Sequence, residues 1–315
     1  MRIKIEISRS QWSEPFFKSV YNLGYEITDS SHADIIVKQA DFITESDLSG
    51  NGSLIALERT DGANISHRHI LMHPNVKHYI KQYNYSNFLF HNLPCVDERL
   101  FTVSLTRDEN LFKANPVSID EAHYKKIILG WNILHYSRMA IAIPENESTP
   151  LNKDRDIDVF FVGTTSYCNS NFLRRSADLI REHREKCITA INSLKGKSVL
   201  AFQGRPYTQR GYLNMLHRSK VVVSPWGWGE ACYRDYEAIL AGCVLVKPLS
   251  DFVISSCNIF QDSYCRWIDP NFLDFQDSIE SALDYYNESL NGRLLKRNKL
   301  VDSYKSVDNI LRRIL

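Results

Sequence analysis

"SPWGWGEACYRDYEAILAGCVLVKP", residues 224–248, decides the fold because it reads as a loop, a helix and a buried strand in succession. The strand-like run "KVVVSP" overlaps its start, and the apolar run "CVLVKP" closes it. Two strands joined through a helix form a crossover unit, which predicts a parallel sheet covered by helices on both faces. Ligands bind at the carboxyl ends of such strands, so the residues directly after "KVVVSP" are the first place to look for a site.

Strand-like and helix-like stretches alternate along both halves of the chain. In the C-terminal half, helical stretches separate the apolar runs "IDVFFVG", "SVLAF", "KVVVSP", "CVLVKP" and "YCRWI". The unbroken apolar character of "IDVFFVG" is typical of a strand buried on both faces. In the N-terminal half, "RIKIEI", "ADIIVKQ" and "SLIALERT" predict strands. We therefore expect an α/β protein with two Rossmann-like, doubly wound domains that face a central cleft.

Two stretches of the N-terminal half predict helices through the residues at their starts. Residues 73–83, "HPNVKHYIKQY", place a proline where the first turn of a helix accepts one. Residues 118–136, "SIDEAHYKKIILGWNILHY", place Ser118 three positions before Glu121, which is the spacing of a capping box.

A polar stretch near the middle of the chain predicts the domain boundary. "IPENESTPLNKDRD" is rich in proline, asparagine and charge and has no apolar period. It divides the chain into an N-terminal domain over 1–150 and a C-terminal domain over 156–295. The remaining 296–315 predict an amphipathic helix that packs back across the domains, since Leu300, Tyr304, Val307 and Leu311 recur at helical spacing.

The helical part of the opening stretch carries its charges on one face. With Glu230 as the first helical residue, Glu230, Arg234 and Glu237 lie within about 60 degrees of one another. Arg234 suits the neutralisation of phosphate, and Glu237, one turn deeper, can accept hydrogen bonds from ribose hydroxyls. Glu230 would repel a phosphate, so it contacts the hydroxyls of a sugar or caps the helix. The structural alternative is a solvated salt bridge between Glu230 and Arg234.

The loop before this helix supplies groups that suit a phosphorylated ligand. Gly227 and Gly229 let a ligand approach the backbone closely, and the amino end of a helix favours a phosphate. Trp226 and Trp228 offer aromatic faces on which a base or a sugar ring can stack. Loop and helix together predict a site for a nucleotide sugar.

The same segment resembles the nucleotide-sugar-binding segment of GT-B glycosyltransferases, especially the exostosin-like and group-1 families. The matching residues are Arg234, Glu237, Ala238, Ala241, Gly242 and Cys243, followed by an apolar strand. "IDVFFVG" with Thr164 and Thr165 resembles the strand and loop that open the C-terminal domain of that family. The resemblance covers about residues 156–250, and the spacing of Glu230 and Glu237 is one residue shorter than in the group-1 families. It implies a GT-B-like fold with the acceptor bound by the N-terminal domain and the donor by the C-terminal domain.

Further candidates stand at the carboxyl ends of other predicted strands. Gly163 and Thr164 follow "IDVFFV". Arg205 follows a glycine after "SVLAF", and two roles are equally expected for it: a contact to phosphate, or a side chain in solvent without a ligand. Lys247, after "CVLV", is another cation that can reach the cleft. As general base we choose Asp61, which follows the strand "SLIAL", although its neighbour Gly62 also fits a simple turn.

Composition and charge limit the partners. With 38 lysines and arginines against 37 acidic residues, the formal net charge is +1, so no global field recruits nucleic acid. Seven cysteines without a CxxC pair favour free thiols in a reducing compartment. We expect a cytoplasmic protein, with docking at the inner face of a membrane left open. The Asp-x-Asp arrangement in "DRDID" lies in the linker, and we expect neither a metal nor another cofactor.

These observations predict a glycosyltransferase that moves a sugar from a nucleotide-sugar donor to a hydroxyl of a glycan or glycolipid acceptor without a metal. The predicted donor contacts are Gly163, Thr164, Arg205, Trp226, Gly227, Gly229, Glu230, Arg234 and Glu237. Two alternatives stay open: a sugar-nucleotide epimerase on the same scaffold, and a non-catalytic protein that binds nucleotides or carbohydrates. The sequence names neither the sugar, nor the base, nor the acceptor.

Overall fold

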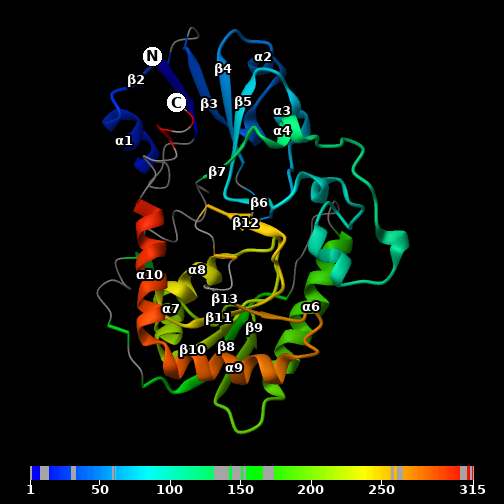
Figure 1. Ribbon diagram of the computed structural model, residues 1–315, viewed down its shortest axis with the longest axis vertical. Coiled ribbons are helices and arrows are strands. Elements are labelled where there is room, and N and C mark those ends of the chain that lie inside the picture. Colours follow the sequence, from blue (N-terminus) through cyan, green and yellow to red (C-terminus); the bar gives the residue numbers. More distant parts are fainter. Residues whose placement is uncertain are drawn as a thin grey trace.

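A computed structural model describes residues 2–7, 14–29, 33–58, 60, 62–130, 142–143, 150–151, 154–165, 174–256, 259–260, 265–305, 311–312 and 314. Two parallel sheets lie one above the other, with a short two-stranded sheet between them (Figure 1). The predicted α/β class with two Rossmann-like sheets is confirmed.

The N-terminal sheet has six parallel strands in the order β2-β1-β3-β4-β5-β7. The first strand in sequence lies inside the sheet, so the chain winds outward from it in both directions. The strands are β1 (Arg2–Glu6), β2 (Glu26–Ile27), β3 (Ile35–Gln39), β4 (Ser53–Leu57), β5 (Val76–Lys81) and β7 (Ile127–Leu129). The helices are α1 (Glu14–Asn22), α2 (Glu45–Leu48), α3 (Arg68–Met72) and α4 (Glu121–Tyr124), with 3₁₀ turns at Ala40–Phe42, Phe88–Asn92, Leu100–Ser104 and Glu109–Leu111.

One predicted N-terminal helix is wrong, and the described part of a second is mostly not helical. Residues 73–83 hold strand β5, which pairs with both β4 and β7. Pro74 lies in the turn before the strand, and a place between two parallel neighbours outweighs the weak helical signal. Within 118–130, the part of this stretch that the structure describes, only Glu121–Tyr124 is helical. Its cap is the carboxylate of Asp120, which accepts a hydrogen bond from the N–H of His123 at 2.8 Å. Strand β7 follows directly, because adjacent isoleucines favour a strand.

The C-terminal sheet has five parallel strands in the order β13-β11-β10-β8-β9. The strands are β8 (Ile157–Gly163), β9 (Val199–Gln203), β10 (Ser219–Val223), β11 (Val244–Pro248) and β13 (Cys265–Ile268). The helices are α6 (Arg174–Asn192), α7 (Gln209–Arg218), α8 (Tyr233–Leu240), α9 (Phe275–Glu288) and α10 (Leu290–Lys305). The winding direction reverses between β8 and β10, and a doubly wound sheet opens a crevice at the carboxyl ends of the strands at such a reversal.

Alternating residues of the central strands fill two separate cores. On β10, Val221 and Val223 pack with α6 and α9 on one face, whereas Val222 packs with α7, α8 and α10 on the other. β8 and β11 divide their side chains in the same way. Both faces of the sheet are therefore apolar, which explains the unbroken hydrophobic runs in the sequence.

Several segments connect the two halves. Strand β6 (Tyr83–Tyr85) of the N-terminal half pairs antiparallel with β12 (Val253–Ser255) of the C-terminal half. On α10, Leu300 and Val301 join the core of the C-terminal sheet, and farther along the chain Leu311 and Ile314 pack against the N-terminal sheet. In Figure 1 the C-terminus accordingly lies beside the N-terminal sheet. The halves are thus tied together at more than one place.

Candidate ligand-binding site

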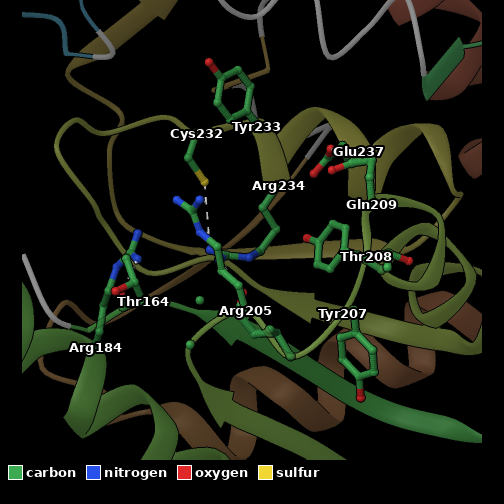
Figure 2. Close-up of a pocket in the computed structure, with 14 residues that line it drawn as sticks. Thr164, Arg184, Arg205, Tyr207, Thr208, Gln209, Cys232, Tyr233, Arg234 and Glu237 are labelled. Carbon is green, nitrogen blue, oxygen red and sulfur yellow. Dashed lines mark hydrogen bonds between the residues drawn. The ribbon is translucent and has the colours of Figure 1, made fainter.

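A cavity of about 200 Å³ opens at the reversal point of the C-terminal sheet. Its walls come from the ends of β8 and β9 and from the first turns of α7 and α8, together with one residue of α6 (Figure 2). The lining residues are Val162, Gly163, Thr164, Arg184, Gly204, Arg205, Tyr207, Thr208, Gln209, Tyr212, Cys232, Tyr233, Arg234 and Glu237. Five of the predicted donor contacts are among them: Gly163, Thr164, Arg205, Arg234 and Glu237.

Arg234 lies at the centre of the cavity. The residue is only 8% exposed, and its Nη2 donates a hydrogen bond to the carbonyl oxygen of Val162 at 2.7 Å. Its guanidinium lies over the ring of Phe161, 4.7 Å from the centroid, and its Nη1 is 3.9 Å from the sulfur of Cys232. Contacts with β8 thus fix the side chain of Arg234, which also lines the cavity.

Gly163 permits this arrangement. A Cβ atom at this position would lie 2.5 Å from Nη2 of Arg234 and 3.5 Å from Nη1 of Arg184. The end of β8 therefore has room for two guanidinium groups only because residue 163 has no side chain. At the end of β9, Gly204 turns the chain with a φ of +99°, a conformation that glycine adopts without strain.

Glu237 faces Arg234 from the next turn of α8. Its carboxylate is almost fully buried, and its Oε1 accepts a hydrogen bond from Nε2 of Gln209 at 2.9 Å. Gln209 is the first residue of α7, whose N-cap is Thr208: the hydroxyl of Thr208 accepts from the N–H of Gly211 at 3.1 Å. Figure 2 shows Glu237 and Gln209 on one side of the cavity and Thr164 and Arg184 on the other.

The charges of the lining do not balance. Three arginines, Arg184, Arg205 and Arg234, share the cavity with one carboxylate, that of Glu237. Arg184 and Arg234 are both buried, whereas Arg205 is exposed. Charges in a partly buried site are screened less than charges in water, so this lining favours a negatively charged ligand.

The structure corrects the role predicted for Trp226. This residue is fully buried outside the cavity, and its ring stacks on His183 with centroids 5.2 Å apart. Its Nε1 donates to the hydroxyl of Ser250 at 2.9 Å. The ring of Trp228 instead lies beneath the guanidinium of Arg99, at 5.4 Å. The predicted stacking of Trp226 on a ligand is therefore replaced by a place in the core.

The two glycines of the tryptophan loop also lie outside the cavity. The N–H of Gly227 donates to the carbonyl oxygen of Gly229 at 3.1 Å, and both residues are buried. These glycines make a tight turn, whereas the sequence suggested a surface for close approach of a ligand.

Helix α8 starts later than predicted, which corrects the position of Glu230. The helix begins at Tyr233 with Cys232 as its N-cap, so Glu230 lies in the preceding loop and does not share a face with Arg234. Glu230 is 2% exposed, and its Oε2 accepts a hydrogen bond from the N–H of Ala63 in the N-terminal half at 3.0 Å. Its Oε1 has no partner within the described residues. Burial raises the pKa of this carboxyl above its ordinary value.

The amino end of α8 already carries a carboxylate of its own. Asp235 accepts a hydrogen bond from the N–H of Cys232 at 2.9 Å and forms an ion pair with Nζ of Lys247, also at 2.9 Å. Both charged side chains are buried. Lys247 therefore lies in this ion pair and does not line the cavity.

The carboxyl end of β4, where the sequence predicts the general base, is described only in part. Asp61, the predicted base, lies outside the described residues. Glu58, at the end of β4, forms a buried ion pair with Lys81 at 3.0 Å and accepts from Thr60 and from the N–H of Ser66. Burial alone would raise the pKa of Glu58, but Lys81 and these hydrogen bonds together lower it.

The aspartates of "DRDID" form ion pairs with basic side chains. Asp156 pairs with Arg218, and Asp158 with Lys220 at 2.7 Å, both at the amino end of β8 and far from Gly163 along that strand. Within the described residues, no group of three or more His, Cys, Asp or Glu side chains is placed to hold a metal ion.

Solved structures similar to the chain include two trehalose-phosphate structures and an alpha-glucosyltransferase. The E. coli trehalose-6-phosphate structure bound with UDP-2-fluoro glucose has a TM-score of 0.49 and 13% identity over 98% of this chain and 78% of that one. An alpha,alpha-trehalose-phosphate synthase (UDP-forming) from Burkholderia vietnamiensis has a TM-score of 0.48 and 9% identity over 98% and 75%. An alpha-glucosyltransferase in complex with UDP and a 13-mer DNA has a TM-score of 0.42 and 12% identity over 96% and 95%.

At these low identities and TM-scores below 0.5, the similarities assign neither a family nor a function to the chain. No protein-family model matches it, and no curated protein matches it by sequence. The exostosin-like and group-1 resemblance stays a prediction. In the described part of the chain, no helix is both long and apolar enough to cross a membrane.

Proposed function

We propose that the chain is a glycosyltransferase whose cavity beside β8 binds the diphosphate and ribose of a nucleotide sugar. The observation that carries this proposal is the lining itself: a buried arginine held against a glycine at the reversal point of a parallel sheet, with a buried glutamate one helical turn away. That edge is where doubly wound sheets bind nucleotides.

Each wall of the cavity suits one part of such a donor. Arg234 and Arg205 can form charge-assisted hydrogen bonds to the phosphates. The same contacts would stabilise the negative charge that develops on a departing nucleoside diphosphate. Glu237, whose Oε1 is held by Gln209, can accept hydrogen bonds from the ribose hydroxyls. A cavity of about 200 Å³ suits this phosphate–ribose part, while the base and the sugar extend beyond it.

The acceptor side of the proposal is a hydroxyl of a glycan or a glycolipid, and it rests on the sequence resemblance. The N-terminal sheet would present this acceptor at its carboxyl edge, where Ala63 and the Glu58–Lys81 pair approach the C-terminal half. Because arginine side chains supply the positive charge beside the phosphates, we propose that transfer requires no metal ion.

Calorimetry with UDP, GDP, ADP and dTDP tests the donor site. We expect at least one nucleotide to bind, and Arg234→Ala to weaken it roughly tenfold to a hundredfold, as loss of a charge-assisted bond implies. Arg205→Ala, at an exposed position that leaves folding unchanged, should weaken it by a smaller factor. Arg210→Ala is the matched control, since Arg210 is exposed on α7 outside the lining. Unchanged affinity in both cavity variants would refute the donor site.

Turnover assays separate the transferase from its two alternatives. Incubation of the protein with nucleotide sugars and a panel of glycan acceptors should release nucleoside diphosphate only when an acceptor is present. Conversion of the sugar nucleotide without an acceptor would instead identify an epimerase. Tight binding without turnover on any acceptor would identify a binding protein. Addition of EDTA should leave the rate of transfer unchanged.

A further inference from the structure

Arg184 reaches the cavity from an unexpected direction. It belongs to α6, which covers the face of the sheet opposite to α7 and α8. Only 5% of the residue is exposed, yet its side chain extends past the end of β8 into the lining beside Thr164 (Figure 2). The two cavity arginines that are buried thus approach from opposite faces of the sheet.

The guanidinium of Arg184 joins two loops at the reversal point. Its Nη1 donates to the carbonyl oxygen of Thr164, after β8, at 2.8 Å. Its Nε donates to the carbonyl oxygen of Trp226, after β10, also at 2.8 Å. The strands before these loops are adjacent in the sheet, and the crevice of the fold opens between them. One side chain therefore fixes both edges of that crevice.

These hydrogen bonds leave a positive charge in the cavity wall. Both of these acceptors are neutral carbonyl oxygens, so these two hydrogen bonds orient the guanidinium and do not neutralise it. Arg234 brings a second positive charge to the same place, since a Cβ on Gly163 would lie within 3.5 Å of both guanidinium groups. Two guanidinium groups that meet at one wall of a cavity together attract an anion bound there more strongly than either does alone.

We propose that Arg184 is a positioning residue for the phosphates of the nucleotide, an inference that rests on the proposed function. It holds the backbone of Thr164 and of the loop after β10 in place, and its charge adds to that of Arg234. The site should accordingly discriminate by charge. A nucleoside diphosphate gains most from Arg184, a nucleoside monophosphate gains less, and a nucleoside gains nothing.

The competing explanation is a purely structural one, in which Arg184 only braces the loops. A brace would matter equally for every ligand in the cavity, whereas a charged positioning residue would matter in proportion to ligand charge. The comparison of a nucleoside with its mono- and diphosphate therefore separates the two explanations, because all three share the base and the ribose.

The test uses calorimetry with uridine, UMP and UDP, or with the corresponding series of whichever base binds the wild-type protein best. For Arg184→Gln we expect about a tenfold loss of affinity for the diphosphate, a smaller loss for the monophosphate and no loss for the nucleoside. Arg184→Lys, which keeps the charge, should recover part of the diphosphate affinity. Arg181→Gln is the matched control, since Arg181 lies on the same helix in an exposed pair with Asp178.

Equal losses for all three ligands would overturn the proposal in favour of a brace. Unchanged affinity for the diphosphate would overturn the proposal as well, and would argue against a brace too. Thermal melting of each variant accompanies the titrations. If Arg184→Gln fails to fold, Arg184→Lys decides the matter: weaker binding of the nucleoside would count against the proposal, and binding of the nucleoside at the wild-type affinity would support it. Failure of the wild-type protein to bind any nucleotide would instead refute the proposed function, and the role of Arg184 with it.

Discussion

The carboxylate of Glu230 and the backbone N–H of Ala63 are hydrogen-bonded at 3.0 Å across the boundary between the two halves of the molecule. The carboxyl is buried, and burial raises its pKa. Below the ordinary value of 4.5 both the folded and the unfolded chain hold this proton. Between that value and the raised folded pKa, the unfolded chain loses its proton first, so this group makes stability fall as the pH rises.

Glu230→Gln should therefore be more stable than the wild type at neutral pH. The amide oxygen can still accept from Ala63, and the cost of a buried charge is gone. Chemical denaturation across pH 4.5–8 should show the difference in free energy of unfolding grow with pH and then level off. Glu121→Gln, at an exposed glutamate that pairs with Lys125, should show no such trend. A constant difference between Glu230→Gln and the wild type would contradict this account.

We expect His183 to make the free energy of unfolding depend on pH in the opposite direction. Burial, followed by the charge of Arg184, lowers its pKa to about 3, so the folded protein holds it neutral between Trp226 and Phe272. The unfolded chain takes up a proton near pH 6.5, so stability is present above that pH and is lost as the pH falls toward 3. This one group should cost about 2 kcal/mol between pH 7 and pH 5.

His183→Phe should remove that part of the acid sensitivity, because a phenyl ring can stack in the same place without a proton to gain. The measurement is the free energy of unfolding at pH 7 and pH 5 for both proteins. His69→Phe provides a comparison at a histidine that is not buried in the core. If the free energy of unfolding falls by the same amount between pH 7 and pH 5 in both proteins, other groups determine the acid sensitivity.

Gly163→Ala should weaken nucleotide binding more than it destabilises the protein. The added methyl would lie 2.5 Å from Nη2 of Arg234, which must then leave the carbonyl of Val162. The atom displaced is the end of a long side chain, so the fold can adjust at modest cost while the phosphate contact is lost. Calorimetry and thermal melting on one preparation compare the two effects. Gly50→Ala, with nothing nearer than 3.4 Å, is the control.

Glu237→Ala should abolish any preference for ribose over deoxyribose. In the wild type the buried carboxylate would accept from both ribose hydroxyls, so the 2′-deoxy analogue should bind roughly tenfold more weakly. In the variant the two nucleotides should bind alike. Gln209→Ala should reduce the preference partly, since Gln209 fixes Oε1 of Glu237. A variant that keeps the wild-type ratio would place the ribose elsewhere.

Lys247→Met should destabilise the protein by about 3–5 kcal/mol, because it leaves the buried carboxylate of Asp235 without its partner. The double variant Lys247→Met with Asp235→Asn should recover part of that loss. Lys220→Met breaks the more exposed pair with Asp158 and should cost less than about 1 kcal/mol. Urea denaturation measures all three, and similar losses for the two lysines would contradict the argument.

The C-terminal sheet could be predicted from sequence because its signals are local. Most of its strands hold a run of three or more apolar residues, and β8 ends at Gly163, which marks the carboxyl edge. The rule that ligands bind at this edge brought Gly163, Arg205, Arg234 and Glu237 together, and the structure places all four in one cavity. Their contact with a nucleotide stays a prediction.

The errors arise where one pattern serves two structures. Tryptophan and glycine residues before a helix are compatible with a ligand-binding loop and equally with a buried turn. Only the packing of Trp226 on His183 in the folded protein distinguishes the two structures. Glu230 fits a helical face only if the helix starts there, and the Cys232–Asp235 cap moves the start to Tyr233. Arg184 was missed because nothing local marks it: its side chain reaches the cavity from the far side of the sheet.

The pairing of β6 with β12 has a consequence for how the molecule can be divided. Each strand would leave a row of unsatisfied amide and carbonyl groups if its partner were removed, and such exposed edges recruit other chains. A shortened protein that ends near residue 150 would expose the unpaired edge of β6, and one that begins near residue 150 would expose the unpaired edge of β12. Co-expression of the two pieces should restore solubility, because β6 of one piece can then pair with β12 of the other.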